Sequence, residues 1–332
     1  MGYRAKKYTF CSRILSALIM LALLGVPVKA LQDDSIPLIG TGTRGDPYQI
    51  RSVDDLLLFS HEVNAGNRFE GNYFRQTVNI DLNEIDWIPI GEFGSENSFC
   101  GIYDGNGYWI ENLTVVSEKN AGFFGQLGGT VMNLGIESGY LSGACMGAIT
   151  SHSSQSSAKI INCYSKATVR GYRAGGIADN FNGAILNCWT DCEMIADGDG
   201  QIGGIVSYDA TFAKNCYILK NSYAEKQSEH KGCTFVSSQQ KTVLPSTLNE
   251  NLYSVASFTG IDPTELNTWK MNEQGNIVMS QQKYSYHWGD ILQYIRCSWV
   301  YMVPTIIVVI TLTMLFLMTF KESGRFGRSH LE

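Results

Sequence analysis

The chain has 332 residues, with 34 glycines against 7 prolines, a balance that suits many short strands with tight corners rather than a disordered linker. Its formal net charge is −6, but the charge is uneven. Between residues 31 and 320 there are 17 Lys and Arg against 29 Asp and Glu, a net charge of −12. This excludes nucleic acid and an anionic membrane surface as expected partners of the middle region.

Residues 1–30 have the pattern of a secretory signal peptide. Basic residues between Arg4 and Arg13 precede an uncharged apolar run from Ile14 to Val26. Val28 and Ala30 then place small residues at the two positions that a signal peptidase reads. The apolar run has 13 residues, fewer than the roughly 20 that a membrane span needs. Cleavage after Ala30 is therefore favoured over an uncleaved N-terminal anchor.

Residues 31–85 are expected to form an N-terminal cap and the first strands. Ser52, followed by Asp55 three residues later, resembles a capping box. Apolar residues at helical spacing run from Val53 to Val63, and Gly66 ends the pattern. A strand should follow, with one face formed by Phe74, Val78, Ile80 and Leu82. A short helix over the first coil would cover an edge that otherwise invites aggregation.

Residues 86–233 carry an internal repeat. Small residues before an isoleucine recur every 28 residues, and an Asn-Cys pair recurs at spacings of 25 and 28 residues. The positions are Gly147, Gly175-Gly176 and Gly203-Gly204, then Asn162-Cys163, Asn187-Cys188 and Asn215-Cys216. One such unit is too small to bury its own apolar face, whereas stacked units bury a continuous core. The repeat therefore predicts an all-β fold, a parallel β-helix or solenoid.

Equivalent positions of successive coils should form ladders. The three cysteines would be a ladder of small buried side chains, and the three asparagines a ladder joined through their amides. A zinc site would need closely spaced cysteines in pairs. Cys188 and Cys192 are the one local pair, and no histidine lies near them in the sequence. We expect structural ladders here and neither a metal nor a cofactor.

The C-terminal part of the sequence predicts a membrane anchor. The repeat is lost over residues 234–296, which we expect to form closing strands and a membrane-proximal stalk. Residues 297–320 contain no charged side chain, and a helix of this length covers about 36 Å against a hydrocarbon core of about 30 Å. Residues 321–332 include three basic residues, which favour the cytoplasmic side. The prediction is one transmembrane helix of a type I protein, with the repeats outside the cell.

Several motifs occur in a characteristic order. They are GTGTRGDPYQI from Gly40, WIPIG from Trp87, FCGIYDGNGY from Phe99, and the repeats described above. This order resembles the GLUG-motif β-helical proteins of bacteria, over about residues 38–290. The resemblance implies a right-handed parallel β-helix on a cell surface. It implies no shared active site, so no catalytic residue is carried over.

The resulting functional prediction is a non-enzymatic platform for adhesion, holding glycans or other surface proteins. Repetition favours binding, because an extended face lets several weak contacts add. The aromatic residues expected to stack on sugar rings are Tyr164, Tyr172, Trp189 and Tyr217.

Two alternatives remain open at this point. Polysaccharide lyases and glycoside hydrolases are often built on β-helices, an inference from fold alone. The acidic residues that would serve are Asp191, Glu193, Asp197 and Asp199, with Lys166, Arg170 or Arg173 from a neighbouring coil. The same acidic residues are also consistent with an ordinary solvated corner. The second alternative is a subunit that assembles with other proteins through its membrane span.

Overall fold

The computed structural model describes residues 38–219 and 233–286. The predicted signal peptide, membrane span and cytoplasmic tail lie outside these residues. Within the described ranges, no helix has the length and apolar character needed to cross a bilayer.

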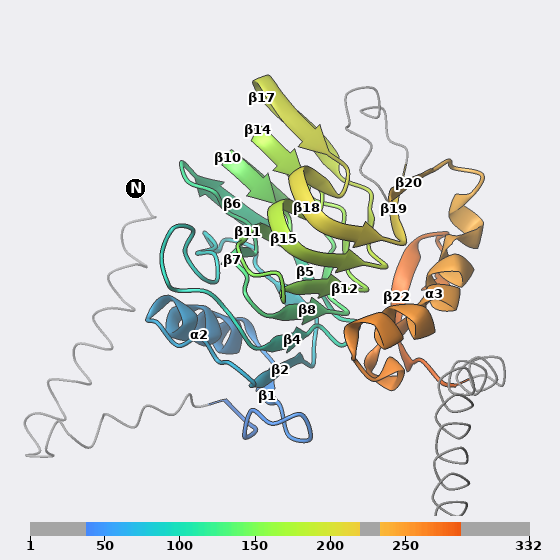
Figure 1. The fold of residues 1–332 in the computed structure, drawn as a ribbon, viewed down its shortest axis with the longest axis horizontal. Helices are drawn as coiled ribbons and strands as arrows, with labels where there is room; N and C mark the ends of the chain where they lie inside the picture. Colours follow the sequence, from blue (N-terminus) through green and yellow to red (C-terminus); the bar gives the residue numbers. More distant parts are fainter. Residues whose placement is uncertain (1–37, 220–232, 287–332) are drawn as a thin grey trace, which may run out of the picture. The chain divides into compact units, whose positions relative to one another are not determined.

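Successive coils pair in parallel to form three sheets of a β-solenoid, which confirms the predicted fold class (Figure 1). The nine-stranded sheet contains β1 (Tyr48–Ile50), β2 (Tyr73–Gln76), β4 (Ile102–Asp104), β7 (Phe124–Gln126), β8 (Thr130–Met132), β11 (Thr150–Ser153), β12 (Lys159–Ile161), β15 (Ala178–Leu186) and β18 (Val206–Lys214). The seven-stranded sheet contains β3 (Ile80–Asp81), β5 (Trp109–Glu111), β9 (Gly135–Ile136), β13 (Tyr164–Ser165), β16 (Trp189–Thr190), β19 (Cys216–Leu219) and β20 (Cys233–Val236). The four-stranded sheet contains β6 (Leu113–Ser117), β10 (Gly139–Gly147), β14 (Thr168–Gly175) and β17 (Glu193–Gly203).

The strand register agrees with the repeat in the sequence. Gly147 pairs with Gly175, and Gly175 pairs with Gly203. On another sheet, the residues after each Asn-Cys pair stack in register as Tyr164, Trp189 and Tyr217. Residues that are equivalent in the sequence therefore lie one above the other in successive coils.

Asparagines occupy the corner between the nine-stranded and seven-stranded sheets. Asn133, Asn162, Asn187 and Asn215 have φ angles of 53°, 56°, 56° and 55°, in the left-handed region that asparagine tolerates better than most residues. Asn187 Nδ2 donates to Asn162 Oδ1, and Asn162 Nδ2 donates to Asn133 Oδ1, both at 2.9 Å. Asn133 Nδ2 donates in turn to Asp104 Oδ1 at 2.8 Å. Three of these asparagines are thus joined in a chain of amides that ends at a carboxylate.

The cysteines beside these asparagines lie in the core. Cys163, Cys188 and Cys216 are fully buried, and their thiols donate to backbone carbonyls, as from Cys188 Sγ to the carbonyl of Leu186 at 3.3 Å. Burial raises the pKa of Cys188 well above its usual value and that of Cys192 to about 12. These thiols therefore stay protonated and act as small apolar groups.

Helix α2 (Val53–Asn64) covers the first coils, as the sequence predicts. Ser52 is its N-cap, and its hydroxyl accepts a hydrogen bond from the Asp55 backbone N–H at 3.1 Å. Phe59 on this helix packs against the core rings of Phe74 and Phe99, with centroids 4.3 and 5.1 Å away. The helix thereby closes the apolar end of the stack.

The described part of residues 234–296 differs from the closing strands and stalk that the sequence suggests. It begins with η3 (Lys241–Val243) and α3 (Leu244–Thr259), followed by η4 (Pro263–Glu265) and an antiparallel pair, β21 (Asn267–Met271) and β22 (Ile277–Lys283). Helix α3 packs its apolar face against solenoid residues including Met132, Ile161 and Leu186. Its leucines recur at helical spacing, a signal that the sequence interpretation missed.

This C-terminal segment also bonds to the asparagine corner. Trp269 Nε1 donates to Asn162 Oδ1 at 2.6 Å, and the Asn267 backbone N–H donates to Asn133 Oδ1 at 3.0 Å. Asn187 Nδ2 donates to the Leu248 carbonyl at 3.2 Å. Residues 244–283 therefore fasten to the solenoid through the ladder itself.

Candidate ligand-binding groove

A groove runs along the outer face of the four-stranded sheet, where β10 lies between β6 and β14. Its volume is about 440 Å³. The floor consists of the small residues Ser142, Gly143 and Ala144 of β10. Because the neighbouring strands carry larger side chains, this run of small residues leaves a channel between them.

The two walls of the groove differ in character. Val116 on β6 is 75% exposed, and Ser117 and Glu118 continue that wall. Tyr172 on β14 is 58% exposed and forms the opposite wall together with Asp197. The groove therefore offers one aromatic ring, one aliphatic side chain and two carboxylates around a floor with few steric obstacles.

A β-bulge places Asp197 in this wall. The register between β14 and β17 shifts after Gly171, so residues 197–200 of β17 loop out opposite Tyr172. Gly198 lies within the bulge with a φ of 60°, a conformation that glycine adopts without strain. Arg170 Nε donates to Asp197 Oδ1 at 2.8 Å, and this bond raises the pKa of the guanidinium. The ion pair neutralises one of the two groove carboxylates.

The structure divides the four aromatic residues expected to contact glycans. Tyr172 lies in the groove. Tyr217 is half-buried, and its hydroxyl accepts a hydrogen bond from Asn251 Nδ2 at 3.0 Å. Tyr164 and Trp189 are buried, with exposed fractions of 2% and 1%.

The assignment of Tyr164 and Trp189 as surface glycan contacts is therefore wrong. Their rings stack 5.0 Å apart, and the ring of Trp269 lies edge-on to both. The C-terminal segment covers what would otherwise be an outer aromatic row of the solenoid. Conversely, Tyr140 on β10 is 41% exposed and was not predicted, although the alternation of its strand indicates an outward position.

The charged residues considered for a lyase or hydrolase do not converge in the described structure. Arg170 pairs with Asp197, whereas Arg173 Nη2 donates to buried Asp179 at 2.8 Å. Lys166 Nζ donates to Glu137 at 2.6 Å.

The remaining acidic residues of that cluster do not complete a site. Glu193 accepts a hydrogen bond from the Thr168 hydroxyl at 3.1 Å. Among the residues that the structure describes, no three acidic, histidine or cysteine side chains are grouped for a metal ion. Three different carboxylates thus engage the three candidate cations.

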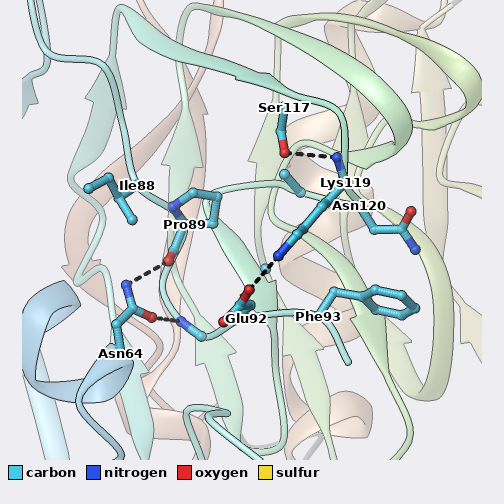
Figure 2. Close-up of a pocket in the computed structure, with 11 residues that line it drawn as sticks. Asn64, Ile88, Pro89, Glu92, Phe93, Ser117, Lys119 and Asn120 are labelled. Carbon is cyan, nitrogen blue, oxygen red and sulfur yellow. Dashed lines mark hydrogen bonds and ion pairs between the residues drawn. The ribbon is translucent and has the colours of Figure 1, made fainter. Parts of the chain in front are cut away.

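A second, smaller pocket adjoins the groove, because Ser117 lines both. It has a volume of about 280 Å³ (Figure 2). Asn64 at the end of α2 holds one wall: its Nδ2 donates to the Pro89 carbonyl at 3.0 Å, and its Oδ1 accepts from the Gly91 N–H at 2.8 Å. Ile88 and Phe93 contribute apolar surface.

Lys119 spans this pocket. Figure 2 shows its side chain pointing toward Glu92, and the ammonium donates to Glu92 Oε1 at 2.6 Å. The bond lowers the pKa of Glu92 and raises that of Lys119. Both side chains are largely exposed, at 52% and 69%. An exposed pair of this kind is weak and exchanges readily.

Comparisons with known proteins give partial similarity. No family model matches the chain, so the resemblance to GLUG-motif proteins stays a prediction. Halomucin of Haloquadratum walsbyi is 32% identical over 116 residues, which are 31% of this chain and 1% of halomucin. A protein named as a Gly-rich membrane protein of Evansella cellulosilytica is 32% identical over 133 residues, 36% of this chain and 14% of that protein. The chain therefore matches only a small part of either relative.

Two solved structures align with the chain at low scores. A Bacteroides ovatus protein assigned as an immunoglobulin A1 protease has a TM-score of 0.46 and 19% identity, covering 74% of this chain and 95% of its own. An IgA1 protease has a TM-score of 0.33 and 12% identity, covering 57% of this chain and 16% of its own. The description of the solenoid rests on the strand pairing of this chain.

Proposed function

We propose that this protein is an exported, membrane-anchored surface β-helix that holds a linear glycan in the groove along β10 without cleaving it. The observation that carries the proposal is the groove itself, with its floor of small residues and the exposed ring of Tyr172 on one wall. An aromatic ring offers a flat apolar surface to the C–H face of a sugar, while Ser142 and the carboxylates offer hydrogen bonds to hydroxyls.

A glycan fits the groove better than a protein partner. Stable protein interfaces bury about 800 Å² on each side, whereas this site is a channel of about 440 Å³. The net charge of −12 between residues 31 and 320 argues against nucleic acid. Extracellular location and anchoring enter the proposal from the predicted signal peptide and span, and a surface position would expose the groove to polysaccharides.

Substitution of Tyr172 tests this proposal. We expect Tyr172→Ala in the full-length chain to weaken retention on the best-bound polysaccharide by about tenfold, because one stacked ring contributes roughly 1–1.5 kcal/mol. The measurement is affinity electrophoresis of wild type and variant through gels containing the polysaccharide.

Tyr208→Ala is the matched control. Tyr208 is 55% exposed and lies on β18 against Arg173, outside the groove lining. Equal retention of wild type and Tyr172→Ala, or an equal loss in both variants, would place the binding surface elsewhere.

A further inference from the structure

The groove and the adjoining pocket differ in charge. Glu118 is exposed in the groove, and Asp197 lies there paired with Arg170. The pocket has one cation, Lys119, whose partner Glu92 is exposed and weakly held. A chain that is neutral along the groove and acidic at one end would match both parts.

The pocket also has a distinctive apolar wall. Ile88, Pro89, Phe93 and Ala121 line it, and Ile88 is 68% exposed. The two hydrogen bonds from Asn64 fix the loop that bears Pro89 and Gly91, so this wall is formed before any ligand arrives. The pocket volume of about 280 Å³ lies at the lower end for ligand sites. It accommodates one sugar-sized unit rather than a length of chain.

We propose that this pocket binds the terminal unit of the glycan, and that this unit is an acidic sugar carrying an apolar acyl group. Its carboxylate accepts hydrogen bonds from the Lys119 ammonium in place of Glu92, and its acyl group packs against Ile88, Pro89 and Phe93. This inference rests on the proposed function. It adds a direction, since the acidic end of the ligand lies beyond Ser117 and its neutral units lie over β10.

The experiment compares three probes on the full-length chain: sialyllactose, its neutral parent lactose, and free phenylacetate. Glu92→Gln removes the competing carboxylate, and we expect it to tighten sialyllactose binding by about two- to fivefold, the factor that an exposed ion pair contributes. Lys119→Gln should weaken sialyllactose binding by about tenfold, to the level of lactose. Neither variant should change lactose binding, and Tyr172→Ala should weaken both sugars.

Lys214→Gln is the control for net charge, because Lys214 is exposed on β18 and lies outside both linings. If lactose binds but Glu92→Gln fails to tighten sialyllactose, this inference is overturned while the proposed function stands. If phenylacetate binds through Lys119 and sialyllactose does not, the pocket takes a free acid and the glycan assignment is wrong. If neither sugar binds the wild type, the proposed function and this inference both fail.

Discussion

Asn162→Ala is expected to lower the free energy of unfolding by about 3–5 kcal/mol. Asn162 lies at the centre of the ladder: its Oδ1 accepts from Asn187 and Trp269, and its Nδ2 donates to Asn133 and to the Asn267 carbonyl. Alanine removes all four bonds and leaves buried polar groups without partners, at about 1–3 kcal/mol for each unsatisfied group. Alanine also pays about 1–2 kcal/mol for a left-handed backbone. Urea unfolding of the full-length chain measures the change.

Asn112→Ala separates the two contributions. Asn112 has a φ of 58°, nearly the same as Asn162, but its side chain is exposed and its Nδ2 donates to Asp81. The backbone cost is therefore shared, while the buried network is absent. A loss at Asn112 as large as that at Asn162 would show that the ladder contributes nothing beyond the backbone conformation.

Gly175→Ala should have a similarly large effect, of more than about 4 kcal/mol, for a steric reason. A Cβ atom at Gly175 would lie 1.7 Å from the Ala178 carbonyl oxygen, and equivalent positions are as tight, at 2.1 Å for Gly147 and 1.7 Å for Gly203. Relief requires the corner between β14 and β15 to open, which disturbs its pairing with the coils on both sides. Loss of the β-sheet signal in circular dichroism, or a much lower melting temperature, would report it.

Gly45→Ala provides the comparison. A Cβ atom at Gly45 meets no atom within 4 Å, and we expect a change within about 0.5 kcal/mol. A fully folded Gly175→Ala protein with wild-type stability would mean that the stacked corners are looser than the structure indicates.

The sequence predicts the stacking of this fold because the repeat acts locally. A spacing of 28 residues between glycine pairs brings Gly147, Gly175 and Gly203 into register, since only equivalent positions bury one continuous core. The same reasoning places asparagines at a left-handed corner and cysteines in the core. Neither prediction requires knowledge of distant segments.

The candidate site is less predictable because it depends on what covers each outer face. Tyr164 and Trp189 have the composition of exposed aromatic positions, but Trp269, about 100 residues away, packs on them. Periodicity identifies outward positions and does not show which of them a remote helix or hairpin will bury. Tyr172 remains exposed because the C-terminal segment packs at the asparagine corner and not on the four-stranded sheet.

The central claim is that the groove binds a glycan and does not turn it over. The most direct test incubates the full-length chain with a panel of host and bacterial polysaccharides, with and without calcium, and measures both retention and reaction products. We predict retention on at least one polysaccharide, with no new reducing ends and no unsaturated uronates. New products that disappear in Asp197→Ala would contradict this account, because they would make Asp197 part of an active site.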